Sequence, residues 1–240
     1  MSRVLPHPGS VGGEQQPQGK SGALRAAIFG VNDGLVSNLS LIMGVTGARV
    51  SNHLVLLAGV AGLLAGAFSM AAGEYISMRV QREVFERLIH LEAHELATQP
   101  DDEREELAAI YRSKGVPAEL ATEVATALMR DPQVALETHA REELGLDPDE
   151  LGSPWRAAGS SFVTFAFGAF VPLVPFLITS GTTAAVWSAI LSAVTLFVVG
   201  ALVSVITGKR FWFAGLRAVL VGAAAAATTF LIGRLIDAAP

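Results

Sequence analysis

Four glutamates in the middle of the chain are spaced for metal binding. Glu92 and Glu95 are three residues apart, as are Glu103 and Glu106, and Pro100 lies between the two pairs. Helical side chains three residues apart share one face, and a proline disfavours helix in the residue before it. If the two helices fold back as a hairpin, four carboxylates converge, and such oxygens are the ligands that hard divalent cations prefer.

Three residues farther along the chain can close the same site. His139, Glu142 and Glu143 lie together on a later helix, and an imidazole among carboxylates also suits Fe²⁺, Mn²⁺ or Zn²⁺. The alternative is that all these carboxylates lie on ordinary solvated helix faces, partly paired with Arg87 and Arg104. Spacing and charge alone leave both interpretations open.

A second set of reactive side chains lies in apolar sequence. Residues 53–73 carry no formal charge, and about twenty such residues are enough to cross a membrane. Glu74 follows directly and shares one helical face with Met70 and Met78. An acid at membrane depth is costly and tends to mark an ion path. A position of Glu74 near the membrane interface is the alternative.

Asp33 is the corresponding acid in the preceding apolar stretch, where Asn38 is also polar. Polar groups at membrane depth need internal partners. Gly30 and Gly34 flank Asp33 with the spacing that allows close helix approach, so we expect Asp33 to be buried in a helix contact. The alternative is an interfacial acid near the start of the helix. Gly62 and Gly66 predict a second close-packing face.

The whole chain is predicted to be an all-α membrane protein with five transmembrane helices, since its apolar residues are clustered rather than periodic. The expected spans are residues 24–48, 53–73 with a helical continuation to about 97, 155–178, 184–207 and 212–236. The expected parts are a disordered tail at 1–22, transmembrane helices 1 and 2 at 23–80, an acidic helical module at 81–151 and transmembrane helices 3 to 5 at 152–240. Pro172 and Pro175 should kink the third span.

Charge separates the module from the rest of the chain. Residues 81–151 hold 18 acids against 7 Lys or Arg, net −11, while the remainder holds 4 against 10, net +6. Such a module suits cations and not nucleic acid, which is bound through Lys and Arg. Within it, Leu120, Val124 and Leu128 repeat every four residues and predict an apolar stripe for its core.

Basic residues predict the orientation. If the module is cytoplasmic, Lys20, Arg25, Lys209 and Arg210 lie on its side of the membrane, and the opposite loops hold only Arg49. This agrees with the positive-inside rule. We therefore expect a cytoplasmic N-terminus and module.

Several chemistries are excluded. The chain has no cysteine, which removes thiolate metal sites and a cysteine nucleophile. It has no Glu-x-x-His, the motif of ferritin-like di-iron oxidases, and no Walker A or Gly-x-Ser-x-Gly motif. We therefore expect no enzyme, and uphill transport would run on an ion or proton gradient.

Two segments carry a recognisable pattern. Residues 29–37, FGVNDGLVS, and 69–77, SMAAGEYIS, together resemble the vacuolar iron transporter (VIT) family, as do EELGL at 142–146 and PLVP at 172–175. The resemblance implies a five-span homodimer with the ion path between protomers and a cytosolic metal-binding module. It also implies an Fe²⁺ or Mn²⁺ carrier that moves metal out of the cytosol by proton exchange, with no prosthetic group.

The resemblance also assigns residues. The implied path residues are Asp33, Met43, Met70, Glu74 and Met78, and the implied module ligands are Glu92, Glu95, Glu103, Glu106 and Glu143. His139 and Ala140 stand where plant-type members are expected to have Met or Glu, which leaves the ligand set and the metal preference open. An Ala- and Arg-rich composition with short loops suggests a bacterial member in the cell membrane. The rival interpretations are a membrane-tethered metal sensor or store and, third, an iron oxidase.

Overall fold

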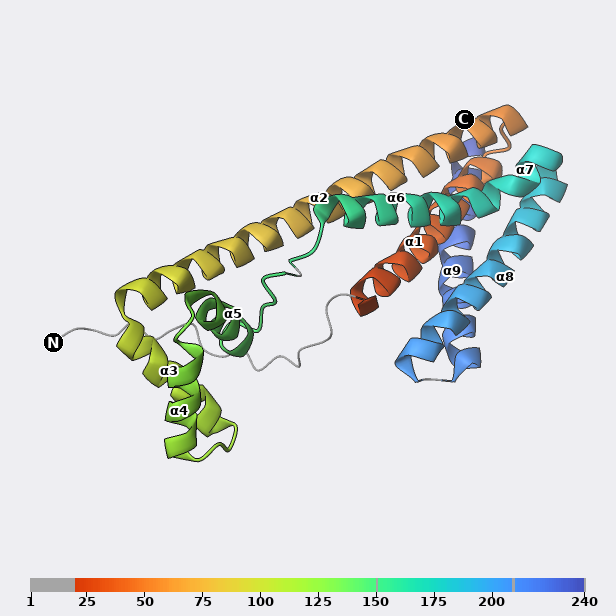
Figure 1. The fold of residues 1–240 in the computed structure, drawn as a ribbon. Coiled ribbons are helices and arrows are strands. Elements are labelled where there is room, and N and C mark those ends of the chain that lie inside the picture. The colour runs from red at the N-terminus through yellow and green to blue at the C-terminus, as the bar shows by residue number, and fades with distance from the viewer. Residues whose placement is uncertain (1–19, 150, 209, 240) are drawn as a thin grey trace. The chain divides into compact units, whose positions relative to one another are not determined.

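The structure is a computed structural model and describes residues 20–149, 151–208 and 210–239. Most of the predicted tail, residues 1–19, lies outside the described residues. The described chain is helical, without a strand, which confirms the predicted all-α class (Figure 1). Its elements are α1 (Lys20–Gly47), α2 (Asn52–Thr98), α3 (Pro100–Ser113), α4 (Ala118–Leu128), α5 (Pro132–Glu142), α6 (Pro154–Phe170), the 3-10 turn η1 (Val171–Leu173), α7 (Val174–Ile178), α8 (Gly181–Thr207) and α9 (Phe211–Asp237).

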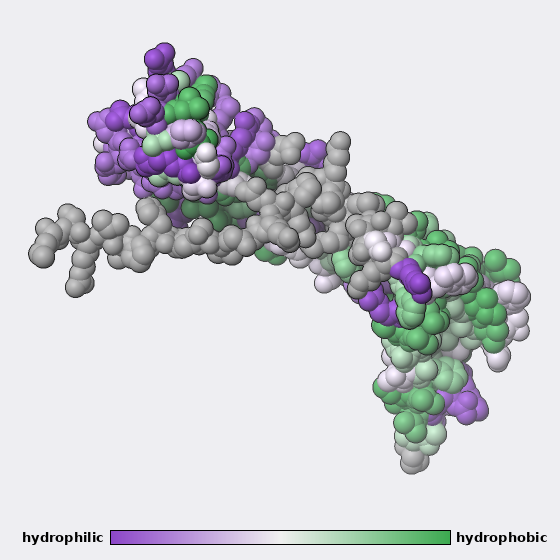
Figure 2. Space-filling model, turned by 90° about the horizontal axis from the view of Figure 1, so that it is seen from below, coloured by the Kyte–Doolittle hydropathy of each residue, from purple (hydrophilic) through white to green (hydrophobic). Residues whose placement is uncertain are grey.

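Five helical segments are long and apolar enough to cross a membrane, as predicted. They are Ala27–Gly47, Asn52–Thr98, Pro154–Ile178, Gly181–Ser204 and Phe211–Asp237. Large apolar side chains cover their outer surfaces, and Figure 2 shows hydrophobic residues gathered over these helices and hydrophilic residues over α3 to α5. A helix satisfies its backbone hydrogen bonds internally, so this surface suits lipid.

The chain divides into two compact units. One contains Phe85–Leu151, and the other contains Ala23–Val84 with Gly152–Pro240. The helix α2 continues through residue 84 without a break and ends at Thr98, just before Pro100. The predicted continuation of the second span to about residue 97 is therefore confirmed.

Glycines bring the spanning helices together. A Cβ on Gly34 would collide with the backbone of Phe165, and a Cβ on Gly168 would collide with that of Val31. The predicted close approach of α1 therefore occurs, against α6. The predicted burial of Asp33 is wrong, since the residue is exposed. Successive residues are rotated by about 100° around a helix, so Asp33 faces away from the contact that Gly34 makes.

The prolines of the third span interrupt its helix as predicted. The α6 helix ends at Phe170 and passes through η1 into α7. Side chains supply hydrogen bonds to carbonyls along this stretch, as is required at membrane depth. The Ser188 hydroxyl donates to the carbonyl of Pro172 at 2.7 Å, and the Asn52 amide donates to that of Phe176 at 3.1 Å.

The core of the module follows the predicted stripe in part. Leu128 packs against the buried cluster of Leu107, Ala108 and Ala125, and Val124 is half-buried, whereas Leu120 is 50% exposed. Because alanine is small, α3 and α4 pack closely on the side of α4 where Ala125 lies. Leu120 lies on another side of α4 and faces outward. The start of α5 is as predicted, with Pro132 in the first turn and the Asp131 side chain accepting from backbone amides.

Candidate metal centre

Four predicted ligands meet inside the module. Glu92, Glu103, His139 and Glu143 each offer one ligand atom, and these atoms lie within 4.8 Å of one another. Nδ1 of His139 lies 3.0 Å from Oε1 of Glu92 and 3.7 Å from both Oε2 of Glu103 and Oε2 of Glu143. The imidazole is thus surrounded by three carboxylates.

Three helices position these side chains. Glu92 lies near the end of α2, and the turn at Pro100 brings Glu103 into the first turn of α3, where a negative charge interacts favourably with the helix dipole. His139 lies in the last turn of α5, and Glu143 caps that helix four residues later, so both occupy one face.

Three members of the cluster are buried and Glu143 is exposed, and the cluster is incompletely hydrogen-bonded. His139 is 0% exposed, Glu92 3% and Glu103 7%. Within the described part of the chain, neither ring nitrogen of His139 nor Oε1 of Glu92 has a hydrogen-bond partner, because the close Nδ1 to Oε1 approach lacks hydrogen-bond geometry. Buried polar atoms without partners are costly. A divalent cation held among these atoms would satisfy them, and the donor set fits Fe²⁺, Mn²⁺ or Zn²⁺.

The same environment changes proton affinities. Burial raises the pKa of Glu103 to about 7, and the nearby carboxylates of Glu92 and Glu106 add to the effect. Burial by itself lowers the pKa of His139, but Glu143 and Glu92 outweigh it and raise that pKa to about 9. Without metal, both groups therefore hold protons at pH 6, and a metal ion must displace them.

We expect metal binding to strengthen as pH rises. Both folded-state pKa values exceed the ordinary values of 4.5 and 6.5, so proton binding stabilises the metal-free fold at low pH. That contribution is lost as pH rises through about 7 for Glu103 and about 9 for His139. In thermal unfolding of the detergent-solubilised protein, Mn²⁺ should raise Tm more at pH 8 than at pH 6, and chelator-treated protein should show the opposite trend. An equal Mn²⁺ effect at both pH values would contradict this.

The other predicted ligands lie outside this cluster. Glu142 forms an ion pair with Lys114, a partner 28 residues away that no local sequence signal indicated. Glu95 is half-buried and Glu106 is exposed, although Glu106 is close enough to raise the pKa of Glu103.

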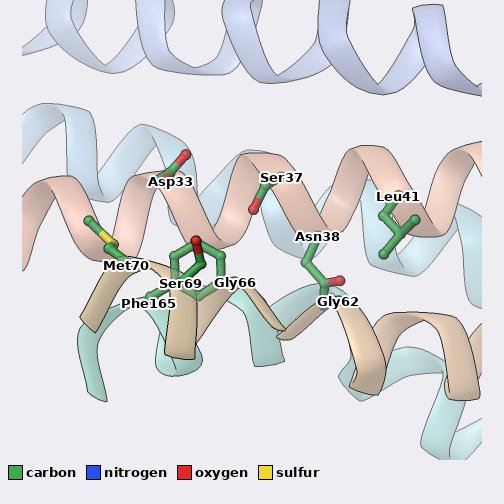
Figure 3. Close-up of a pocket in the computed structure, with 9 residues that line it drawn as sticks. All are labelled: Asp33, Ser37, Asn38, Leu41, Gly62, Gly66, Ser69, Met70 and Phe165. Atoms are coloured by element: carbon green, nitrogen blue, oxygen red, sulfur yellow. The ribbon is translucent and has the colours of Figure 1, made fainter. Parts of the chain in front are cut away.

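A separate pocket of about 320 Å³ lies among the spanning helices (Figure 3). It contains two of the predicted path residues, Asp33 and Met70, although the Asp33 carboxylate points away from Met70 in this view. The full lining is Asp33, Ser37, Asn38, Leu41, Gly62, Gly66, Ser69, Met70 and Phe165. Of these, Ser37, Leu41, Ser69 and Phe165 were not singled out from the sequence, because only their positions in the fold distinguish them from other residues of apolar helices.

Three predicted path residues do not line this pocket. Glu74 is half-buried and follows Met70 by about one helical turn. Met78 is half-buried beside Gly152. Met43, on α1, is 7% exposed and belongs to the buried hydrophobic core.

Five apolar helices, with a pocket among them, and a cluster of three carboxylates and one imidazole in the module define a multi-pass membrane protein with a candidate cation site. The sequence profile of the VIT family matches residues 24–234, so the chain belongs to that family. This confirms the predicted family.

Curated relatives agree over nearly the whole chain. The chain is 32% identical over 218 residues to "Vacuolar iron transporter 1" of Arabidopsis thaliana, covering 89% of this chain and 86% of that protein. It is 34% identical over 227 residues to "Vacuolar iron transporter" of Acanthamoeba castellanii, covering 90% and 80%. It is 31% identical over 234 residues to "Vacuolar iron transporter homolog 5" of Oryza sativa subsp. japonica, covering 97% and 89%.

Membership in this family supplies the general activity. Members of the VIT family are transporters and not enzymes, so the prediction that the chain is not an enzyme is confirmed, and metal-ion transport is its function.

Proposed function

We propose that the protein is a secondary carrier that exports divalent iron or manganese from the cytoplasm in exchange for protons. The observation that carries this proposal is the cluster of three carboxylates and one imidazole, in which only Glu143 is exposed, in a chain of this family. Oxygen and imidazole donors together suit Fe²⁺ and Mn²⁺, and the relatives named above are iron transporters by name. Glu92, Glu103, His139 and Glu143 collect the metal.

Asp33 and Glu74 carry the ion through the membrane, with Met70 or Met78 as soft ligands, and protons entering from outside release it. An exposed carboxylate on a spanning helix is expensive in lipid. The exposure of Asp33 in the single chain therefore supports a homodimer in which a second protomer covers it and the path lies between the two copies.

The proposed location is the cell membrane, with the N-terminus and module cytoplasmic. The distribution of basic residues supports this orientation. Arg49, in the loop after α1, lies 4.0 Å from Asp237 at the end of α9. That loop and the end of α9 therefore lie on one side of the membrane, as five spans require.

Flux in vesicles tests the proposal. Protein reconstituted into liposomes should take up Fe²⁺ or Mn²⁺ faster when the interior is acidic than without a pH gradient, because outward proton movement drives metal inward. The uptake should be followed by a metal-sensitive dye, with Zn²⁺ and Ca²⁺ compared and protein-free liposomes as the control.

Two other results of this flux experiment would support a different function or mechanism. Metal binding without uptake would indicate a membrane-tethered sensor or store. Uptake that is independent of the pH gradient would remove proton exchange from the mechanism and leave a metal carrier.

A further inference from the structure

Asn38 is a buried amide in the middle of a spanning helix. It lies on α1, is 2% exposed, and lines the membrane pocket together with Asp33 and Met70. Such a group in a spanning helix must be bonded on both its donor and acceptor sides to be tolerated.

The donor side is satisfied and fixes the orientation of the amide. Nδ2 of Asn38 donates to the carbonyl oxygen of Ala169 on α6 at 2.6 Å. Since a carbonyl only accepts, the nitrogen must face Ala169 and the oxygen must face the other way. The hydrogen bond therefore presents Oδ1 in a set direction.

The acceptor side has no partner among the described residues. Oδ1 of Asn38 is buried and receives no hydrogen bond. In Figure 3 the side chain extends from α1 toward α2, with its oxygen beside Gly62. A Cβ on Gly62 would lie 3.0 Å from Oδ1, so the missing side chain at Gly62 leaves room beside this buried oxygen.

The pocket has the space and the side chains to hold a cation, which would be a partner for the Asn38 oxygen. Its volume of about 320 Å³ admits a cation with several waters, and the other lining residues that carry oxygen or sulfur in their side chains are Asp33, Ser37, Ser69 and Met70. An amide oxygen is a neutral ligand that manganese and other oxygen-preferring divalent ions accept.

We propose that Oδ1 of Asn38, oriented by the Ala169 carbonyl, is a ligand for the transported cation in this pocket and favours oxygen-preferring ions such as Mn²⁺ over Zn²⁺. This inference rests on the proposed function and adds a residue that sets its ion preference. The competing explanation is that Asn38 only ties α1 to α6 through its nitrogen.

Three variants separate these explanations in the vesicle assay. Asn38→Leu removes both sides of the amide. Asn38→Asp keeps an oxygen but cannot donate to Ala169. Gly62→Ala keeps the hydrogen bond to Ala169 but places a methyl group against Oδ1 and the flexible end of Leu41.

A ligand role predicts that Asn38→Leu and Gly62→Ala raise KM for Mn²⁺ by about tenfold and lower the Mn²⁺ to Zn²⁺ preference, while Asn38→Asp keeps a KM close to wild type or below it. Gly159→Ala, whose Cβ would meet open space, is the matched control and should behave as wild type. If Asn38→Leu fails to fold, as judged by thermal unfolding in detergent, the other two variants decide.

Two results would overturn the inference. Unchanged KM and ion preference in Gly62→Ala, with Asn38→Asp as damaging as Asn38→Leu, would leave Asn38 as a structural tie while the carrier function stands. Absence of metal flux in the wild-type protein would overturn the carrier proposal and this inference with it.

Discussion

Replacing Asp33 with asparagine should reduce metal flux in vesicles to the level of protein-free liposomes. Asp33 is the one charged residue among the described residues that line the pocket. A divalent ion that leaves water needs an anionic ligand, and loss of a close charge pair in such surroundings costs about 3 kcal/mol or more, a hundredfold or greater loss of rate. Asparagine has nearly the same shape, and Asp33 is exposed, so the fold should persist.

The matched control is Asp237→Asn, which removes an acid at the far end of α9 that pairs only loosely with Arg49 and should retain flux. Glu74→Gln should abolish flux as Asp33→Asn does if the path continues one turn past Met70. Retained flux in Asp33→Asn would remove the pocket from the path. Retained flux in Glu74→Gln alone would confine the path to the pocket.

Replacing His139 with leucine should weaken Mn²⁺ binding by about a hundredfold or more, because a central donor is lost from a site whose atoms are otherwise all carboxylate oxygens. It should also destabilise the metal-free protein by about 3 kcal/mol, since three carboxylates then face one another with no positive partner. Calorimetry and thermal unfolding of the detergent-solubilised full chain measure the two effects.

Neighbouring residues supply close controls for this experiment. His94→Leu removes an exposed imidazole from α2 and should change neither measurement. Glu143→Gln should weaken Mn²⁺ binding, whereas Glu142→Gln, which affects only the ion pair with Lys114, should not. If His139→Leu destabilises the protein but Mn²⁺ affinity is unchanged, the cluster is a structural ion network and not a metal site.

Much of the membrane architecture could be predicted because its signals are local. An uncharged run of sufficient length predicts a span, and the absence of proline between residues 52 and 98 allows α2 to continue. Glycines four residues apart predict a close contact, although not the partner helix. The partner of Gly34 is Phe165, more than a hundred residues away, and only the fold identifies it.

The composition of the metal cluster could be predicted only in part. Glu142 and Glu143 are adjacent in sequence, yet only Glu143 faces His139. Successive helical side chains diverge by about 100°, so a small change in where α5 ends decides which carboxylate enters the cluster. That endpoint depends on tertiary packing, which residue spacing does not report.

The core of the module shows the same limit. The repeat beginning at Leu120 has the correct helical period and its last member, Leu128, packs on the core, but the fully buried positions of α4 are Ala121 and Ala125. Hydrophobicity predicted that the large side chain of Leu120 would be buried. Close packing of α3 on α4 instead favours the small side chain of Ala125 at the contact. Close packing decided the outcome.

The interruption of the third span has a consequence for motion during transport. Side chains from three different helices, Asn38, Asn52 and Ser188, each donate to a carbonyl between Ala169 and Phe176. Bending at this interruption would break three hydrogen bonds at membrane depth together. The glycine contact between α1 and α9 also includes such a bond, from the Thr229 hydroxyl to the carbonyl of Ser40 at 2.6 Å. Because three of these bonds are gathered at the interruption of the third span, we expect α6, η1 and α7 to move together rather than to bend apart.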